Sequence, residues 1–263
     1  MKRMMIITAC AVFTAATAFA ETNVVDGDIA KELAEIGLQA YRTGCRYAHG
    51  KGVERDLKKA FECYLLGAEA GYVRAEAAVA TCYWNGEGTR RDYKNAAYWE
   101  ERAAMHGNSC SMFSMGIMRH FGFDGNTNCY EACGWFRLAA ENGYGDPKFE
   151  PDMIEEEGCG PDVSLRWILS AAELGNSNAL YWLAVCYRRG RGVERDKEIS
   201  DNLMMIAADK GSSLAKCIVG CDMWCGRISG SRDEGLALVR EAEGRGNITA
   251  YQHLEKLDTT GSL

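Results

Sequence analysis

The sequence predicts an all-α fold, a solenoid of about six tandem helix-turn-helix repeats. Three observations predict it: glycines that recur at a nearly fixed spacing, a glycine-rich loop that keeps phase with them, and pairs of small residues four positions ahead of most of them. The recurring glycines, spaced by 36, 36, 32, 36 and 35 residues, are Gly71, Gly107, Gly143, Gly175, Gly211 and Gly246.

Each repeat is predicted to contain two amphipathic helices, which we name helix A and helix B, because apolar residues recur at three- and four-residue spacing on both sides of the loop. In the first repeat, helix A is expected near Gln39 to Ala48 and helix B at about Leu57 to Ala70. Asp56 is suited to cap the start of helix B. The loop, which recurs with a following aspartate, reads Gly50-Lys51-Gly52-Val53, Gly86-Glu87-Gly88-Thr89 and Gly190-Arg191-Gly192-Val193.

Small residues near the end of helix B allow a neighbouring helix to approach closely. The pairs are Gly67-Ala68, Ala103-Ala104, Ala139-Ala140, Ala171-Ala172 and Ala207-Ala208. A single hairpin cannot bury both of its apolar stripes, so successive repeats are expected to stack.

The predicted organisation has a signal peptide at 1–20, an N-terminal segment with a capping helix at 21–38, repeats across 39–249, and a C-terminal capping helix and tail at 250–263. The repeats are assigned to 39–74, 75–110, 111–146, 147–178, 179–214 and 215–249.

Three repeats depart from the pattern. Asp124 replaces the second loop glycine of the third repeat, and the loop of the sixth repeat is also irregular. The fourth repeat is four residues short and has Pro147 and Pro151 where helix A should lie. Its first helix is therefore expected to be broken or absent, which would bend the solenoid there.

The first 20 residues have the pattern of a bacterial signal peptide: a basic start, an apolar run and the small-residue site Ala18-Phe19-Ala20. We therefore expect a secreted or periplasmic protein with no membrane span in the mature chain. An uncleaved N-terminal anchor and a lipoprotein site at Cys10 are the less favoured alternatives.

The charge of the chain argues against nucleic acid as a partner. The sequence has 30 basic and 37 acidic residues, a formal charge of −7. Removing a signal peptide that contains Lys2 and Arg3 would make the charge still more negative, whereas nucleic-acid-binding surfaces are basic.

The repeat resembles that of the Sel1-like family, which is related to the tetratricopeptide repeat. The fifth repeat matches the family pattern at Ala179, Leu183, Ala184, Tyr187, Gly190, Gly192, Val193 and Asp196. The second matches it at Ala75, Tyr83, Gly86, Gly88, Asp92, Ala96 and Trp99. The resemblance covers about residues 39 to 257 and implies a right-handed α-α superhelix that acts as a protein-protein interaction scaffold or adaptor.

A binding face is predicted on the side of helix A that points away from helix B, where the first helices of the repeats would line a groove for an envelope or host protein. This face combines arginine, histidine and aromatic residues, a composition typical of protein-binding hot spots. The predicted contact residues are Arg42, His49, Asn85, Phe121, Trp182 and Arg189, with Ile117 and Val185 on the same face. The alternative is that the aromatic residues pack between repeats.

The sequence has 12 cysteines, of which Cys10 lies in the predicted signal peptide. Disulfides to neighbouring helices are the favoured interpretation in an oxidising compartment, followed by simple packing. Cys45 and Cys63 are equidistant from the middle of the first loop and would bridge if their α-carbons come within about 7 Å. The candidate disulfide residues are Cys45, Cys63, Cys129, Cys133, Cys217, Cys221 and Cys225.

Neither catalysis nor a cofactor is predicted. The four histidines form no H-x-x-x-H pair, and the only metal-like spacing is that of Cys217, Cys221 and Cys225, for which disulfides are preferred to a soft metal. Ser213-Leu214-Ala215-Lys216 and Ser200-Asp201-Asn202 imitate parts of the β-lactamase signature, but in reversed order and without K-T-G. An envelope enzyme or sensor for peptidoglycan or β-lactam-like ligands is the alternative function.

Overall fold

The computed structural model describes residues 27–144, 160–244 and 247–260. The predicted signal peptide and the first helix of the fourth repeat, with Pro147 and Pro151, lie outside these residues. The chain forms two compact units that divide between Asn108 and Ser109.

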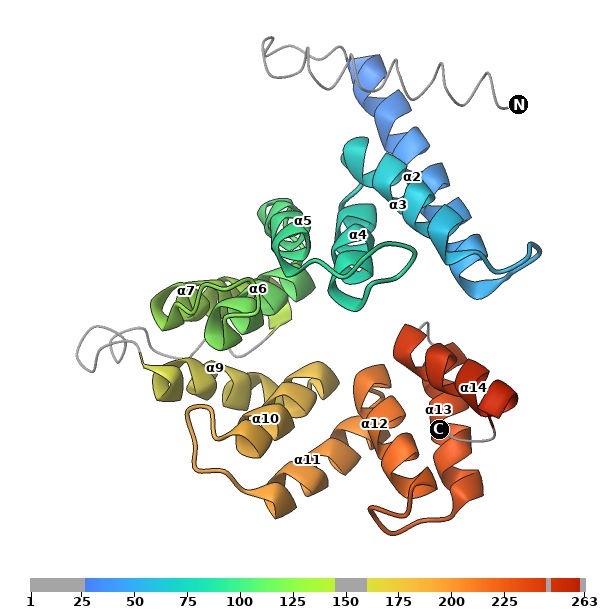
Figure 1. Ribbon diagram of the computed structural model, residues 1–263. Coiled ribbons are helices and arrows are strands. Elements are labelled where there is room, and N and C mark those ends of the chain that lie inside the picture. The colour runs from blue at the N-terminus through green and yellow to red at the C-terminus, as the bar shows by residue number, and fades with distance from the viewer. Residues whose placement is uncertain (1–26, 145–159, 245–246, 261–263) are drawn as a thin grey trace. The chain divides into compact units, whose positions relative to one another are not determined.

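The first unit contains two helix pairs (Figure 1). Their bounds are α2 (Gly27–His49), α3 (Leu57–Glu69), α4 (Val73–Asn85) and α5 (Tyr93–Met105). The predicted N-terminal capping helix and the first helix A form one continuous helix, α2, so the first repeat has no break near Gln39.

The second unit continues the same pattern of consecutively packed helices (Figure 1). Its elements are α6 (Ser109–Phe121), α7 (Cys129–Ala139), η1 (Ala140–Tyr144), α9 (Pro161–Glu173), α10 (Ser177–Arg189), α11 (Lys197–Asp209), α12 (Ser213–Trp224), α13 (Arg232–Gly244) and α14 (Ile248–Thr260). The predicted terminal helix is present as α14. The described residues contain no strand, so the expected all-α repeat fold is confirmed.

The loop chemistry explains where the helices begin and end. Asp56 caps α3 by accepting the backbone N–H of Lys59 at 3.0 Å, and Asp196 caps α11 by accepting that of Ile199 at 2.9 Å. Of the recurring glycines, the five that the structure describes, Gly71 to Gly211, have left-handed backbone conformations, for example φ 80° at Gly71. The regular glycine spacing in the sequence thus marks the positions where successive helices end.

The second loop glycine also allows the loop to pack closely against a neighbouring repeat. A β-carbon at Gly88 would collide with the carbonyl oxygen of Leu57, at the start of the preceding helix B. A β-carbon at Gly192 would collide in the same way with the carbonyl oxygen of Pro161. The equivalent Gly52, in the first repeat, has only an arginine side-chain atom nearby, at 3.7 Å. In the second and fifth repeats this glycine therefore lets the loop lie against the helix B before it.

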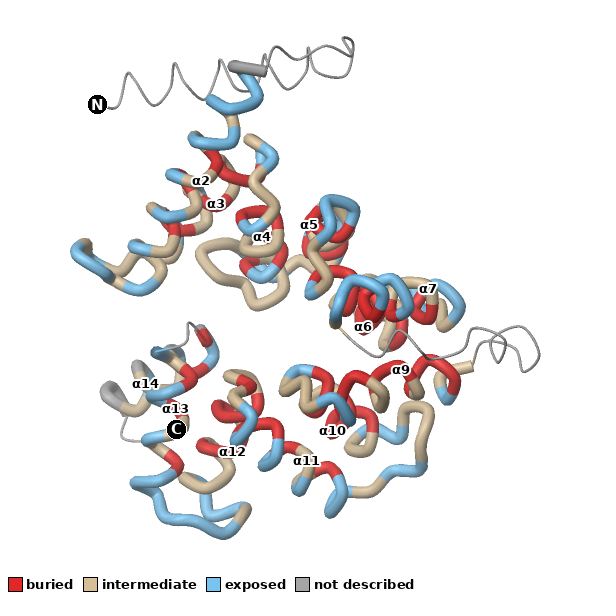
Figure 2. The backbone as a smooth tube through the Cα atoms, turned by 180° about the vertical axis from the view of Figure 1, so that it is seen from behind, coloured by how far each residue is buried: buried red, intermediate tan, exposed pale blue. Residues whose placement is uncertain are grey.

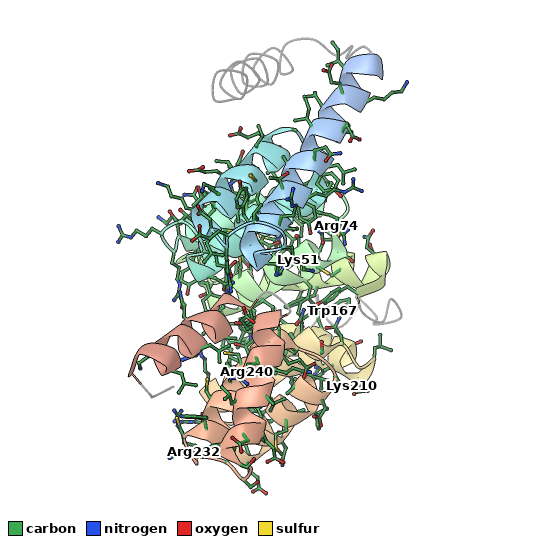
Figure 3. The ribbon with its side chains drawn as sticks, turned by 90° about the vertical axis from the view of Figure 1, so that its right-hand side faces the viewer. Lys51, Arg74, Trp167, Lys210, Arg232 and Arg240 are labelled. Carbon is green, nitrogen blue, oxygen red and sulfur yellow. The ribbon has the colours of Figure 1, made fainter. Side chains whose placement is uncertain are left out.

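Buried residues line the faces where helices meet (Figure 2). In the first unit the core is made of small residues and aromatic rings. Arg74 of α4, labelled in Figure 3, lies over the Tyr41 ring of α2, with its guanidinium carbon 6.0 Å from the ring centroid. Larger side chains fill the second unit, where Phe136, Met115 and Ile168 are fully buried. Burial of these apolar faces, rather than isolated helix propensity, holds the hairpins together.

Candidate functional site

One group of side chains on the second unit brings together three of the residues predicted for the binding face. Phe121, the last residue of α6, contacts Trp182 of α10 with ring centroids 5.5 Å apart. Phe123, in the following loop, lies 5.5 Å from Phe121 and 5.9 Å from Trp182. All three rings are half-buried. We call these rings together with Arg189 the aromatic surface.

Arg189 completes this surface with a positive charge. It is the last residue of α10, seven positions after Trp182, so both lie on the same side of the helix. Its guanidinium carbon is 5.7 Å from the Phe121 ring centroid and 5.9 Å from that of Phe123, within the range of cation–π attraction. The side chain is exposed, which leaves charge and apolar area side by side at the surface.

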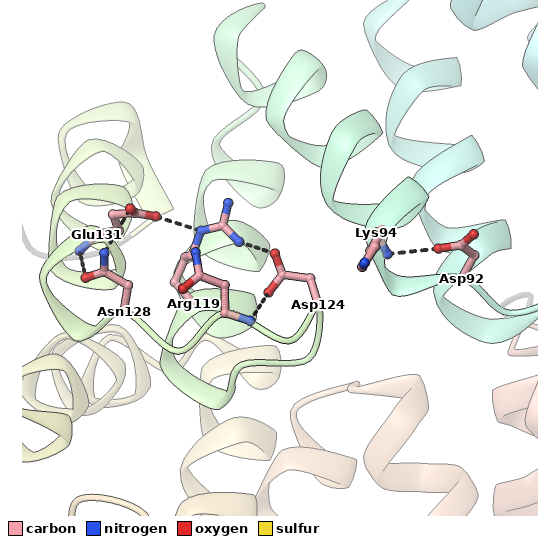
Figure 4. A network of polar contacts seen from close by, with 7 residues as sticks. Asp92, Lys94, Arg119, Asp124, Asn128 and Glu131 are labelled. Carbon is pink, nitrogen blue, oxygen red and sulfur yellow. Dashed lines mark hydrogen bonds and ion pairs between the residues drawn. The ribbon is translucent and has the colours of Figure 1, made fainter.

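The loop that carries Phe123 is fixed by an ion-pair network (Figure 4). Arg119 pairs with Asp124, the residue that replaces the usual second glycine, and its Nε lies 2.8 Å from Glu131. Asn128 caps α7 by accepting the Glu131 backbone N–H at 3.1 Å. The irregular loop of the third repeat is therefore an ordered structure that positions Phe123, a residue the sequence pattern did not single out.

The six predicted contact residues divide between the two units. Phe121, Trp182 and Arg189 are brought together, whereas Arg42 and His49 are exposed on α2 and Asn85 ends α4. The Asn85 amide donates to Glu87 at 2.5 Å, within its own loop. Burial raises the pKa of that Glu87 carboxyl to about 7.

Two apolar residues expected on the binding face are in the core instead. Ile117 is 1% exposed and Val185 is 8% exposed. Assigning faces at ideal 100° steps fails at these positions because helix periodicity does not show which neighbours cover a helix: α10 packs against α9 as well as α11, and α6 packs against η1 as well as α7.

A buried cluster around His120 resembles catalytic machinery in composition only. The Nδ1 atom of His120 is 2.7 Å from the Ser164 hydroxyl oxygen, and its Nε2 atom is 3.8 Å from the Cys186 sulfur. All three residues are fully buried, and burial raises the pKa of Cys186 to about 12. A protonated thiol with no contact to solvent is a poor nucleophile, so we assign the cluster to the connection between α6, α9 and α10.

A second buried polar group connects α4 and α5. Glu76 is 0% exposed, and its carboxylate lies 3.0 Å from an Arg102 nitrogen and 2.7 Å from the His106 Nδ1. The Arg102 guanidinium also lies over the Trp99 ring at 4.8 Å. A carboxylate held by two partners in this way is a structural ion pair.

The two serine motifs do not form a nucleophile with a base. Ser200 is fully buried on α11, at the small-residue position of helix B. Ser213 starts α12, and Lys216, the base that its motif would supply, pairs its ammonium group with Glu241. These contacts give the alternative enzyme function no geometric support.

The candidate disulfide cysteines have other contacts in the structure. Cys45 and Cys63 are free thiols, and the Cys45 sulfur accepts a hydrogen bond from the Tyr64 hydroxyl at 3.6 Å, so the predicted bridge between them is not formed. Cys129 accepts a hydrogen bond from Arg191 at 3.9 Å, and Cys133 is buried on α7. Cys225 is an exposed free thiol.

Cys217 and Cys221 interact with each other across one turn of α12. The Cys217 thiol donates to the Cys221 sulfur, and this hydrogen bond lowers the pKa of Cys221. His253, which the sequence placed near neither cysteine, comes from α14 and lies beside them.

Comparison with known protein families identifies the repeats. The model of the Sel1 repeat matches residues 40–72, 73–108, 111–144, 161–176 and 177–212, together more than half of the chain. The chain belongs to the Sel1 repeat family. The hairpin of α12 and α13 lies beyond these matches but continues the same helix pairing.

The chain is similar to parts of longer proteins. It is 28% identical over 144 residues to a chitin synthase regulator of Saccharomyces cerevisiae, covering 54% of this chain and 16% of the regulator. It is 30% identical over 168 residues to an F-box protein of Arabidopsis thaliana, covering 64% of this chain and 37% of that protein. The chain thus spans well under half the length of these relatives.

Among solved structures, a Sel1 repeat protein from Oxalobacter formigenes is 23% identical, with a TM-score of 0.42, over 86% of this chain and 79% of that one.

Sel1 repeats commonly act as scaffolds for protein–protein interaction, and the family is typically non-catalytic. Across the part of the chain that the structure describes, no helix combines the length and apolar character needed to cross a bilayer.

Proposed function

We propose that this chain is a protein-binding adaptor that contacts its partner through the aromatic surface. The observation that carries the proposal is the packing of Phe121, Phe123 and Trp182 against one another beneath the exposed Arg189. Tryptophan and arginine dominate binding hot spots because they bury large areas and combine apolar contact with directed charge.

The chemistry of the surface indicates what a partner must present. Arg189 is exposed and carries a positive charge over the rings, so a partner carboxylate placed against it would gain a charge-assisted hydrogen bond. The rings below supply apolar area around that contact. The expected partner is therefore a protein that offers an acidic side chain next to an apolar or aromatic one.

The proposal also includes the setting of the protein, in the cell envelope or outside the cell. Support for this part comes from residues 1–20, whose basic start, apolar run and small-residue site are typical of a cleavable signal peptide. Mass spectrometry of the mature N-terminus in the native host tests it, and an intact Met1 in the purified native protein would contradict it.

The binding proposal is tested by capturing partners from the native host with the wild-type chain and with Arg189→Glu, then measuring the affinity of each captured protein. A lost hot spot costs about 2 kcal/mol, so we expect the affinity to fall at least about 30-fold. Trp182→Ala should weaken the same partner. Because Arg189 is exposed at a helix end, its substitution should leave the fold intact.

The matched control is Arg137→Glu, which reverses an exposed arginine on α7, outside the aromatic surface. This variant should bind as the wild type does. Equal affinity of the wild type and Arg189→Glu for every captured partner, or equal losses in both reversed variants, would contradict the proposal.

A further inference from the structure

Three metal-ligating side chains meet at the C-terminal end of the second unit. Cys217 and Cys221 lie one turn apart on α12, and His253 comes from α14. Their two sulfur atoms and one imidazole nitrogen lie within 4.8 Å of one another. Cys217 is buried, while Cys221 and His253 are partly exposed.

These three side chains come together because α12 and α14 are anchored to each other near their first residues. The buried Asn247 donates from its amide to the Ser213 carbonyl oxygen at 3.0 Å and caps α14 by accepting the Ala250 N–H at 3.0 Å. From this anchor, His253 lies six residues along α14, a rise of about 9 Å. The cysteines lie four and eight residues along α12, rises of about 6 and 12 Å that bracket the histidine.

Apolar packing holds the helices in this register. Cys217 belongs to a small core with Val239 and Ala242 of α13 and Ala250 of α14, and Cys221 and Leu254 pack against it. The cysteines therefore pack into a core to which both α13 and α14 contribute. The ligand positions lie on packed helices rather than on a loop, which favours a defined geometry.

The same three residues line a cavity of about 490 Å³. A fourth ligand could reach the cluster from this cavity without any rearrangement of the helices. Most of the charges around it are positive: Arg188, Arg195, Lys197 and Arg227, against Asp201 and Asp222. Two of the arginines are neutralised in part, because Arg188 pairs with Asp201 at 3.1 Å and Arg227 with Asp222 at 2.8 Å.

The donor set fits Zn²⁺. Two sulfurs and an imidazole nitrogen are the ligands that zinc prefers, and tetrahedral bond lengths of about 2.3 Å would place the two sulfurs about 3.8 Å apart. The corresponding sulfur–nitrogen separation is about 3.5 Å, so the observed separations, all within 4.8 Å, require a contraction of at most about 1.3 Å. Two thiolates would balance the metal charge, and the surrounding cations favour an anionic fourth ligand.

A disulfide between the same cysteines is disfavoured by helix geometry. Residues four apart on a helix have β-carbons about 5 to 6 Å apart. A disulfide needs about 3.5 to 4.5 Å between its β-carbons, so forming one here would distort α12. Both sulfurs therefore stay available to a metal more readily than two cysteines on facing helices would.

We propose that Cys217, Cys221 and His253 form a three-ligand Zn²⁺ site whose fourth position is reached from the adjoining cavity. The proposal is independent of protein binding at the aromatic surface. It replaces the sequence-based preference for a disulfide or packing role at Cys217 and Cys221, and it adds a histidine from a different helix.

The test is a titration of the reduced, full-length protein with Co²⁺ as the spectroscopic probe, followed by displacement with Zn²⁺. The wild type should take up one equivalent and develop thiolate-to-cobalt charge-transfer absorption. Cys221→Ala should remove most of that absorption, and His253→Ala should weaken Co²⁺ binding at least about tenfold. Circular dichroism checks that each variant keeps its helices.

Cys225→Ala is the matched control, because Cys225 is an exposed thiol one turn further along and outside the cluster. It should bind Co²⁺ as the wild type does, as should Arg189→Glu. No charge-transfer absorption in the wild type, unchanged affinity in His253→Ala, or loss of binding in Cys225→Ala would each overturn the assigned ligand set.

Discussion

His120 shows how a single buried polar side chain can organise three helices. It is fully buried, its ring contacts Ser164 and Cys186, and its carbonyl oxygen accepts two hydrogen bonds from Arg191 at 3.0 and 2.6 Å. Burial, and then the Arg191 charge, lower the pKa of His120 from 6.5 to about 4. The imidazole is therefore neutral in the folded protein at physiological pH.

The first prediction follows from the lowered pKa of His120. Because the folded pKa lies below the unfolded value of 6.5, the stabilisation is complete above pH 6.5 and is lost as the pH falls through about 4. This histidine should contribute about 2 to 3 kcal/mol to that loss. Urea unfolding of the second unit at a series of pH values measures this loss of unfolding free energy.

His120→Asn provides the control, because an amide can still hydrogen-bond to Ser164 but does not titrate in this range. The variant should be less stable at pH 7 and should have a shallower loss of stability between pH 6.5 and 4. Identical slopes in the two proteins would show that other groups cause the acid sensitivity.

At the scale of the helix pair, the second loop glycine links one repeat to the next. The left-handed conformation alone, φ 72° at Gly52 and 67° at Gly88, would suit glycine in any isolated hairpin. Only Gly88 and Gly192 also lie against the start of a preceding helix B. The glycine thus serves both the turn and the stacking, and the first repeat needs it for the turn alone.

The second prediction separates these two roles. Gly52→Ala should cost about 1 kcal/mol of unfolding free energy, from backbone strain. Gly88→Ala should cost about 3 kcal/mol, because its β-carbon also meets the Leu57 carbonyl oxygen. Urea denaturation of the two single variants compares the losses, and equal losses would mean that the loop moves away from α3 at little cost.

The sequence predicted the helices well because their ends are encoded locally. Capping residues such as Asp56 and left-handed glycines such as Gly71 act within a few residues of themselves, so their spacing is visible without a structure. Continuity across Gln39 was missed because no glycine or cap separates the expected capping helix from the first helix A.

The candidate sites were harder to predict because they depend on contacts between repeats. Phe123 joins Phe121 only through the Arg119–Asp124 loop, and His253 reaches Cys217 only when α14 is anchored by Asn247. Phe123 lies in a loop and His253 lies on a different helix from the cysteines, so helix periodicity in the sequence could not link them to the residues they contact. Ile117 was assigned to the surface for the same reason, since helix periodicity does not show which neighbour covers a face.

At the scale of the whole molecule, repeat proteins lack a single core, and their stability is the sum of local terms and nearest-neighbour interfaces. The buried Glu76 pair lies wholly within the first unit, between α4 and α5. The His120 cluster lies wholly within the second, between α6, α9 and α10. Each unit therefore contains its own buried polar connection.

The third prediction uses the fact that the Glu76 and His120 groups lie in different units. Glu76→Ala should destabilise the first unit by about 2 kcal/mol, because it removes the carboxylate that holds Arg102 and His106, both of which keep some contact with water. Hydrogen exchange should quicken in α2 to α5 while α10 to α13 keep their protection, as expected for local cooperative units. His120→Asn should give the reverse pattern. If either substitution quickens exchange equally throughout the described helices, the chain unfolds as one cooperative body and the two units have no separate stabilities.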